Sequence, residues 1–417
     1  MKKILFTIQW YPTVLSANAL CDEKIINLLK RDKQYEINCL TYKNENQAKV
    51  GKYNDIKVFR FRRSLWWDIV IKAKQNKGLS PSFILKLDHL LLRIKQVLTI
   101  PIFPIVNLKS CIKFALKAYN LQKKNNYDIV ISEHHGIDSL LAGYFLKRHF
   151  PQIKFVAILW DPISAKTPVR YLSARYALNR SIALERSMLK HADYVIGMKS
   201  SENTVSVYNL GYDEKHKFFD IPGIVEQVAT TYKCPQLKDG YVNIVYSGVL
   251  SLPDRDPSYL IDIINLCPFA ERVNLVFFCT GFGRVILEQK SDVFKGIISI
   301  CDYIPHADLL SVYRDSDVLL NFGGVNESMV PSKIFEYMSM CKPILSTYKI
   351  DNEASKHYLD RYPSALCLDE RKSLDENALL LQEFLQNIDR LQVSFEEVKN
   401  KFPLNTPAIY VDLIKQL

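Results

Sequence analysis

Two kinds of hydrophobic pattern alternate along this chain of 417 residues. Short, uninterrupted apolar runs predict buried strands, whereas longer stretches with apolar residues at every third or fourth position predict amphipathic helices. In the first half, the predicted strands are residues 3–8, 36–42, 57–61, 129–132, 154–159 and 194–198, and the predicted helices are residues 18–30, 82–98, 109–123, 137–148 and 170–191. This alternation predicts α/β architecture with parallel sheets.

The alternation is interrupted once, at residues 222–240, where polar residues mix with a weak apolar pattern. Beyond this predicted linker, strands recur at residues 242–247, 274–279, 297–301, 318–321 and 343–346, with helices between them. We therefore expect two Rossmann-like domains of similar design, residues 1–225 and residues 240–395, joined near residue 230.

Composition agrees with a folded protein of two domains. With 48% apolar and 24% charged residues, the chain can form two hydrophobic cores. Nine scattered cysteines lack metal-binding spacing, so we expect core cysteines in a reducing cytoplasm and no metal site. No apolar window is long enough to span a membrane, and the opening strand is too short for a signal peptide.

The net charge of +11 is unevenly distributed. Residues 57–124 contain fifteen Lys or Arg against two acids, Asp68 and Asp88, and they include the pair Trp66-Trp67. Basic residues interleaved with large apolar ones predict an interfacial element on an anionic membrane. Two alternatives remain. The segment could form ordinary amphipathic helices with a solvated basic face, or it could bind nucleic acid, although no recognition motif accompanies the charge.

The most informative run is MVPSKIFEYM, from Met329 to Met338. Pro331 suits the first turn of a helix, and Lys333 and Glu336 then share one face of that turn. A helix N-terminus with a lysine beside it attracts phosphate, and an acid one turn later can accept hydrogen bonds from ribose or sugar hydroxyls. The run therefore favours a nucleotide-sugar site that includes Ser332. A solvated Lys–Glu pair on a surface helix is the alternative.

With CKPIL after it (residues 341–345), this run resembles the donor-site helix of bacterial glycosyltransferases of the GT-B fold, nearest to the family-four group that builds surface polysaccharides. MKKILFTIQWYP (residues 1–12), ERSMLKHADYVI (185–196) and NIVYSGVL (243–250) resemble other segments of that family. Residues 57–125 match nothing specific. The resemblance implies two domains facing across a cleft, a C-terminal segment (residues 396–417) that crosses back to the first domain, and retention of the donor's anomeric configuration.

Further donor-site candidates follow the predicted strands of the second half. Gly248 permits close approach of the backbone, and Arg255 can bind a diphosphate with a bidentate fork, although a structural role for Arg255 is the alternative. Gly281 follows the next strand. By resemblance, the loop with Tyr303 and Ile304 grips the base, while a simple turn at that position explains the same residues.

One position departs from the family pattern. Many family-four enzymes have two glutamates spaced Glu-x7-Glu, and Glu336 fits the second. The place of the first is taken by Ser328, with Glu327 one residue out of register. Either Glu327 is shifted into place by its loop, or Ser328 and a backbone amide contact the sugar.

Acceptor-side candidates end two strands of the first half. His134 and His135 follow one strand, where a histidine can act as a base or hold a phosphate; surface histidines are the alternative. Asp161 follows the next strand and offers a carboxylate to orient the acceptor hydroxyl or the histidine.

Together these features predict a metal-independent glycosyltransferase that uses a nucleotide-diphosphate sugar as co-substrate and no other cofactor. The expected acceptor is a glycan or polyprenyl-linked glycan of capsule or other surface-polysaccharide synthesis, made at the inner face of the plasma membrane. A non-hydrolysing nucleotide-sugar epimerase and a non-catalytic binding partner of the same fold remain alternatives. A dinucleotide dehydrogenase is disfavoured because no GxGxxG follows the first strand.

Overall fold

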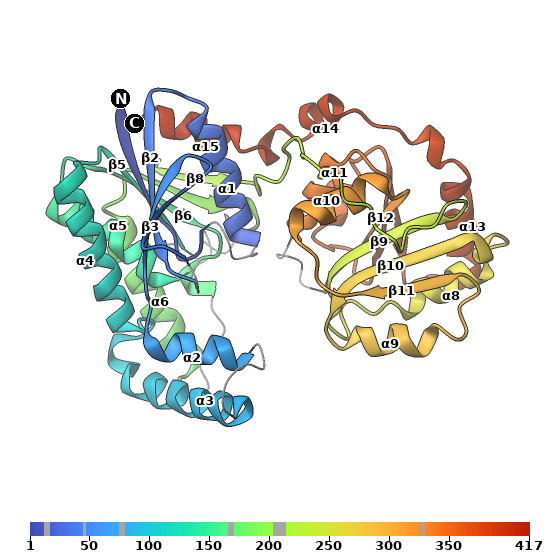
Figure 1. The fold of residues 1–417 in the computed structure, drawn as a ribbon, viewed down its shortest axis with the longest axis horizontal. Coiled ribbons are helices and arrows are strands. Elements are labelled where there is room, and N and C mark those ends of the chain that lie inside the picture. Colours follow the sequence, from blue (N-terminus) through green and yellow to red (C-terminus); the bar gives the residue numbers. More distant parts are fainter. Residues whose placement is uncertain are drawn as a thin grey trace. The chain divides into compact units, whose positions relative to one another are not determined.

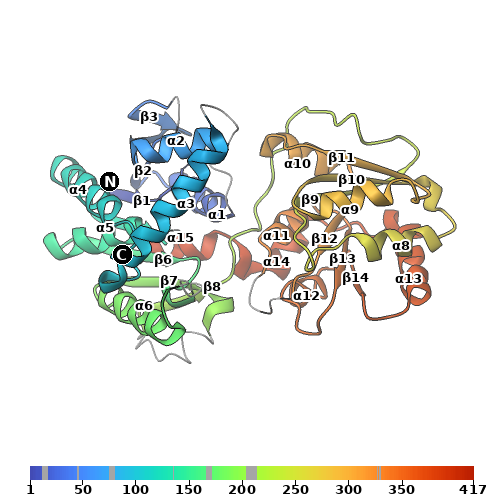
Figure 2. The same cartoon turned by 90° about the horizontal axis from the view of Figure 1, so that it is seen from below.

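The computed structural model describes residues 1–11, 17–44, 47–74, 80–134, 136–165, 171–202, 214–325, 327 and 330–417. The chain forms two compact units (Figure 1). Unit 1 contains Met1–Asp220 and Ala408–Leu417, and unit 2 contains Ile221–Pro407. Each unit has its own sheet with helices packed against it (Figures 1 and 2).

Unit 1 is built on an eight-stranded sheet of order β3-β4-β2-β1-β5-β6-β7-β8. All its pairs are parallel except β3–β4, which is antiparallel. Its strands are β1 (Lys2–Thr7), β2 (Tyr35–Tyr42), β3 (Val50–Tyr53), β4 (Ile56–Phe61), β5 (Ile129–Glu133), β6 (Lys154–Leu159), β7 (Tyr194–Met198) and β8 (His216–Phe219). Central strands such as β5 are buried throughout, as expected for a parallel sheet covered on both faces.

The helices of unit 1 connect these strands, and the last one comes from the end of the chain. They are α1 (Ala17–Lys30), α2 (Leu65–Lys74), α3 (Pro81–Leu98), α4 (Leu108–Asn125), α5 (Ile137–His149), α6 (Ala174–Leu189) and α15 (Ala408–Lys415). Helix α15 packs against α1, where Lys415 pairs with Asp32 at 3.1 Å. The Tyr410 hydroxyl donates to the Asp220 carbonyl oxygen at 2.9 Å, so the C-terminal helix is anchored within unit 1.

Unit 2 has a fully parallel six-stranded sheet of order β11-β10-β9-β12-β13-β14. Its strands are β9 (Val242–Val249), β10 (Val273–Thr280), β11 (Ile297–Cys301), β12 (Val318–Phe322), β13 (Ile344–Tyr348) and β14 (Ala365–Asp369). Its helices are α8 (Ser258–Leu266), α9 (Gly283–Lys290), α10 (His306–Asp315), α11 (Lys333–Ser339), α12 (Lys356–Leu359), α13 (Leu374–Gln386) and α14 (Phe395–Lys401).

Side chains of the central strands of unit 2 alternate between two cores. Ile244 and Phe277 pack into a core with residues of α8 and α13, whereas the adjacent Val245 and Val276 pack into a core with residues of α10 and α11. This period of two places one core on each face of the sheet. The loops after the strands are thereby held along the carboxyl edge of a rigid layer.

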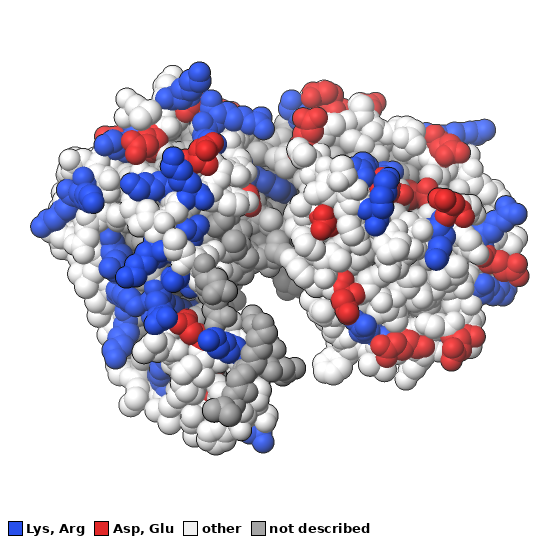
Figure 3. Space-filling view, viewed as in Figure 1, with Lys and Arg blue, Asp and Glu red and all other residues white. Residues whose placement is uncertain are grey.

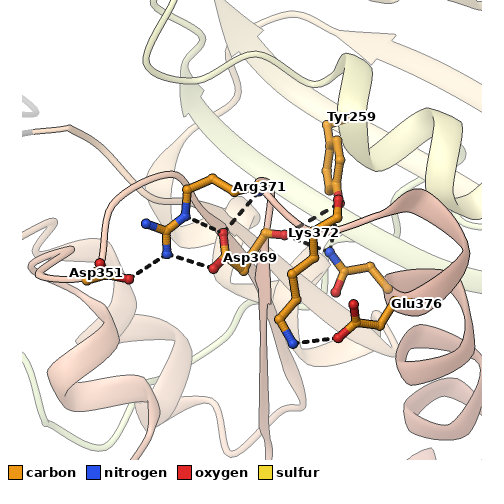
Figure 4. A network of polar contacts seen from close by, with 7 residues as sticks. Tyr259, Asp351, Asp369, Arg371, Lys372 and Glu376 are labelled. Atoms are coloured by element: carbon orange, nitrogen blue, oxygen red, sulfur yellow. Dashed lines mark hydrogen bonds and ion pairs between the residues drawn. The ribbon is translucent and has the colours of Figure 1, made fainter.

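The end of β14 is fixed by a polar network (Figure 4). The Arg371 guanidinium pairs with Asp351 at 2.5 Å and with Asp369 at 2.7 Å, and Lys372 pairs with Glu376 at 2.5 Å. Apart from the largely buried Asp369, these side chains are exposed to solvent, so the pairs Arg371–Asp351 and Lys372–Glu376 add little stability. The network shows that both cations at this end of the sheet already have carboxylate partners.

The expectation of two parallel-sheet α/β units is confirmed. Several elements escaped the sequence pattern: the short strands β3, β8 and β14, and helix α2. The helix predicted over residues 170–191 is shorter, because Ser173 caps α6 by accepting from the Tyr176 N–H at 3.3 Å. No helix among the described residues is long and apolar enough to cross a bilayer.

Candidate active site

The candidate donor residues of unit 2 gather at the carboxyl edge of its sheet. Gly248 is the second-last residue of β9 and Arg255 follows that strand, whereas Gly281 follows β10 and Tyr303 follows β11. These three strands are direct neighbours. Ligands of parallel α/β sheets bind at this edge because the loops and helix starts converge there. The structure thus brings together residues that lie far apart in the sequence.

Lys333 is tied to the end of the central strand β9. Its ammonium group donates to the carbonyl oxygen of Ser247 at 2.8 Å and to the Ser247 Oγ at 2.5 Å. The Tyr313 hydroxyl also hydrogen-bonds this Oγ, and the Ser247 N–H donates to the Tyr337 hydroxyl at 3.4 Å. Burial lowers the pKa of Lys333, and the nearby Glu336 carboxylate opposes that shift. The ammonium is therefore held in place by neutral oxygens.

Arg255 supplies a second cation beside the same strand end. Its guanidinium donates to the Val249 carbonyl oxygen at 3.3 Å, and its backbone N–H donates to the Ser251 carbonyl oxygen at 2.7 Å. Burial raises the pKa of Tyr246 to about 12, against the opposing effect of the adjacent Arg255 charge. Arg255 also acts to lower the pKa of Lys333, so the two positive charges lie close enough to repel. An anion between them would relieve that repulsion.

Glycine is required where the loop after β10 meets the loop after β9. Gly281 has φ +98°, and a Cβ atom there would lie 2.5 Å from the Leu250 carbonyl oxygen. The Gly283 N–H donates to the same oxygen at 3.1 Å. Gly248 has φ +150°, and a Cβ atom at this position would lie 3.0 Å from the Tyr246 hydroxyl. At Gly281 the backbones of the two loops are thus packed directly against each other, whereas Gly248 leaves room for the Tyr246 side chain.

Glu336 has a partner that the sequence analysis missed. His306, the first residue of α10, lies with its Nε2 2.7 Å from Oε2 of Glu336 on α11. Because a carboxylate only accepts, His306 donates through Nε2. Glu336 is 5% exposed, and the bond fixes the direction of its carboxylate. The available signal was weak: a histidine directly after the Ile304-Pro305 turn.

Two exposed aromatic rings follow adjacent strands. Tyr303, after β11, is 70% exposed, and Phe282, after β10, is 80% exposed. Ile304 beside Tyr303 is half-buried. Arg284, at the start of α9, pairs with Asp302, beside Tyr303, at 3.1 Å. Planar rings on neighbouring loops suit contact with a nucleobase, and the role of Tyr303 and Ile304 stays a prediction.

The helix that carries Lys333 differs from the expectation. Helix α11 begins at Lys333 and has seven residues, so Pro331 and Ser332 precede it and Pro331 does not occupy its first turn. A short helix contributes little dipole, which leaves the side chains as the main source of positive charge. Glu327 lies in an exposed turn, and Ser328 lies outside the described residues. The choice between these two for the first acidic position stays open.

On the acceptor side, the structure pairs His134 with Asp161, but through the main chain. Nδ1 of the buried His134 lies 2.8 Å from the carbonyl oxygen of Asp161, whereas the Asp161 side chain is exposed. The carboxylate of Asp161 therefore does not make this contact with the histidine. The backbone does so because the loops after the adjacent strands β5 and β6 run together. His135 lies outside the described residues.

Beside His134 lie buried carboxyl groups that the sequence analysis passed over. Burial raises the pKa of Glu133 well above its usual range, and the Asp22 carboxylate raises it further, against the effect of the Gln9 backbone N–H. Burial also raises the pKa of Asp22, although Trp160 Nε1–H donates to it at 3.2 Å. The nearby Asp138 accepts from Gln9 and Tyr42. Burial thus favours the protonated form of both Glu133, at the end of β5, and Asp22, on α1.

Within the described ranges, no group of three or more His, Cys, Asp or Glu residues is placed to hold a metal ion. Independence from metal ions stays a prediction.

The raised pKa of Glu133 predicts a pH-dependent stability. The unfolded chain releases the Glu133 proton above about pH 4.3, whereas the folded chain retains it, so folding stability falls by about 1.4 kcal/mol per pH unit until the folded pKa is passed. We expect Glu133→Gln to raise the free energy of unfolding at pH 7.5 and to leave it unchanged near pH 4. Denaturant unfolding across this pH range measures the difference.

The matched control is Glu271→Gln, which changes an exposed carboxylate of unit 2 and is expected to have no pH-dependent effect. The free energies of unfolding of wild type and Glu133→Gln could instead differ by the same amount at every pH. That result would contradict a raised pKa of Glu133.

Comparison with known proteins rests on structure alone. No known family model matches the chain, and no curated protein matches it in sequence. Solved structures do match: a trehalose-6-phosphate synthase, OtsA, has a TM-score of 0.65 at 13% identity and covers 100% of this chain and 98% of its own. A UDP-forming α,α-trehalose-phosphate synthase from Burkholderia xenovorans has a TM-score of 0.61 at 12% identity. The match covers 100% of this chain and 98% of the synthase.

A protein described as a UDP-N-acetylglucosamine 2-epimerase, from Listeria monocytogenes, has a TM-score of 0.57 at 14% identity and covers 97% of this chain and 94% of its own. At such low identity these likenesses show the fold. The chain therefore has the GT-B fold of two parallel-sheet α/β units, which is shared by glycosyltransferases and by such an epimerase.

Proposed function

We propose that this protein is a glycosyltransferase that moves a sugar from a nucleoside-diphosphate sugar to a glycan or lipid-linked acceptor in surface-polysaccharide synthesis. One observation carries the proposal. Arg255 and Lys333 converge on the end of β9, and Glu336, held by His306, lies one helical turn beyond Lys333. Two cations followed by a fixed carboxylate match a diphosphate followed by a ribose.

Arg255 and Lys333 would assist the chemical step as well as donor binding. When the bond between the sugar C1 and the phosphate oxygen breaks, negative charge grows on the departing diphosphate. Arg255 and Lys333 would stabilise that charge, the role that metal ions take elsewhere. We therefore propose transfer without a divalent metal; retention of anomeric configuration, an expectation from the family-four resemblance, stays a prediction.

The fold supports nucleotide-sugar chemistry, because it is shared with synthases that are UDP-forming. The epimerase alternative shares both the fold and the need for a diphosphate site. The two differ in product: a transferase releases a nucleoside diphosphate, whereas an epimerase returns an altered nucleotide sugar.

The first test is a thermal-shift panel of UDP-, GDP- and dTDP-sugars, with and without EDTA. A bound donor at 100 times its dissociation constant should stabilise the protein by about 2.7 kcal/mol. We expect one base to be preferred and EDTA to have no effect. Absence of any shift would contradict a donor site, and a shift abolished by EDTA and restored by Mg²⁺ would contradict metal independence.

The second test addresses the two cations. Arg255→Ala and Lys333→Ala should each lower turnover about a hundredfold, because the leaving diphosphate loses a charged donor. Both should also weaken binding of the preferred nucleoside diphosphate in calorimetry. The control is Arg371→Ala, which removes a cation from the same sheet edge that already has two carboxylate partners (Figure 4). Near-normal turnover in both site variants would exclude this assignment.

The third test addresses His306 as a positioning residue. Losing a hydrogen bond to the Glu336 carboxylate should weaken nucleoside-diphosphate binding about tenfold in His306→Ala. Binding of pyrophosphate to His306→Ala should be unchanged. The hydrogen bond from His306 orients Glu336, which would contact the ribose, and does not orient Arg255 or Lys333. His306→Gln, which can still donate, should restore most of the affinity. Equal losses for both ligands would mean that His306 supports the whole site.

A further inference from the structure

Helix α3 has an unusual surface for a folded protein. Ten of its eighteen residues are Phe, Ile, Leu or Val, yet none of its side chains is buried. Isolated exposed apolar residues are common, but contiguous ones mark a surface that another partner covers.

Five apolar residues of α3, four of them exposed, lie on one face of the helix; the exposed Leu98 adjoins this face, and the exposed Leu92 lies on the opposite one. Phe83, Leu87, Leu90, Ile94 and Val97 follow spacings of four, three, four and three, which align them along one side; we call them the outer stripe. Phe83 is 64% exposed, Leu90 53%, Ile94 47% and Val97 48%, and Leu87 is half-buried.

The other face of α3 is fixed to the body of unit 1. Helix α2 packs against it, and Trp66 Nε1–H donates to Asp88 Oδ1 at 2.7 Å. Trp67 stacks on Trp10 with ring centroids 5.9 Å apart. The tryptophan pair is therefore engaged within unit 1, and α3 carries the more exposed apolar surface.

Basic residues flank the outer stripe. Helical geometry places Lys86 and Arg93 along one side of it, whereas Lys95, seven residues after Asp88, lies on the face of Asp88. The one acid of the helix, Asp88, accepts from Trp66 on the attached face. Helix α4 repeats the pattern, with exposed Leu108, Ile112 and Leu116 each followed by a lysine. Figure 3 shows Lys and Arg gathered over the α4 side of unit 1, with few acids among them.

We propose that the outer stripe of α3 binds unit 1 to an anionic lipid bilayer. Its apolar side chains would enter the acyl boundary while Lys86 and Arg93 meet lipid phosphates, each cation contributing about fivefold to the affinity. Charge complementarity favours this occupant over a second copy. Two stripes packed together would bring like cations into contact, and Asp88 is engaged elsewhere.

The experiment is co-sedimentation of the full chain with phosphatidylcholine vesicles containing 0 to about 40% phosphatidylglycerol. No donor or acceptor is present, so the result is independent of the proposed enzyme activity. We expect binding that rises with anionic lipid and weakens at high salt, since contacts are screened beyond about 10 Å at 0.1 M.

The variant Leu90→Glu with Ile94→Glu should lose at least about tenfold in vesicle binding per substitution, because each removes an inserted side chain. The matched control is Val285→Glu with Leu379→Glu, which makes the same charge change at exposed apolar positions of unit 2. Circular dichroism and thermal unfolding verify that both variants are folded.

Three outcomes would overturn the proposal. The first is a wild-type protein that stays in the supernatant at every composition in low salt. The second is equal loss of binding in both double variants, which would indicate a charge effect without insertion. The third is a dimer, seen by light scattering, that Leu90→Glu with Ile94→Glu dissociates while vesicle binding is absent, which would assign the stripe to a second copy.

Discussion

The ammonium group of Lys333 is the contact around which the donor side of unit 2 is arranged. It joins the start of α11 to the end of the central strand β9, and two buried phenols hold the serine that receives it. Neutral oxygens replace only part of the hydration that a cation loses on burial, which is why the pKa of Lys333 is lowered. An arriving anion would supply the missing charge, so ligand binding and the charge of this lysine are coupled.

The carboxyl edge of the sheet in unit 1 has buried acidic groups where unit 2 has a half-buried lysine. Burial raises the pKa of both Glu133 and Asp22, and the Asp22 charge raises the pKa of Glu133 further. Such an arrangement weakens folding at neutral pH, and functional sites are common places for it. The neighbouring His134 is fixed by a main-chain oxygen, so its ring orientation does not depend on the exposed Asp161 side chain.

Strong local patterns explain why most of the fold was predictable. Strands β6 and β7 have the predicted bounds because their apolar runs are uninterrupted. Strand β3 was missed because it is a half-exposed edge strand of four residues, and the sequence VGKY carries no clear period. In the site, Lys333 and Glu336 were predictable because they lie three residues apart. His306 and the Asp22–Glu133 pair were not, since tertiary packing brings them together across 30 and 111 residues.

The hydrogen bonds at the ends of unit 2 have a topological consequence. The Ile224 N–H donates to the Asn405 carbonyl oxygen at 2.8 Å, and the Asn405 side chain donates to the Ile221 carbonyl oxygen at 3.4 Å. The chain therefore enters and leaves unit 2 through neighbouring residues, while α15 returns to unit 1. Unit 2 is therefore an inserted domain, preceded and followed in the sequence by segments of unit 1. Because the two ends of unit 2 are adjacent, residues 221–407 can in principle be replaced by another domain without interrupting the sheet of unit 1.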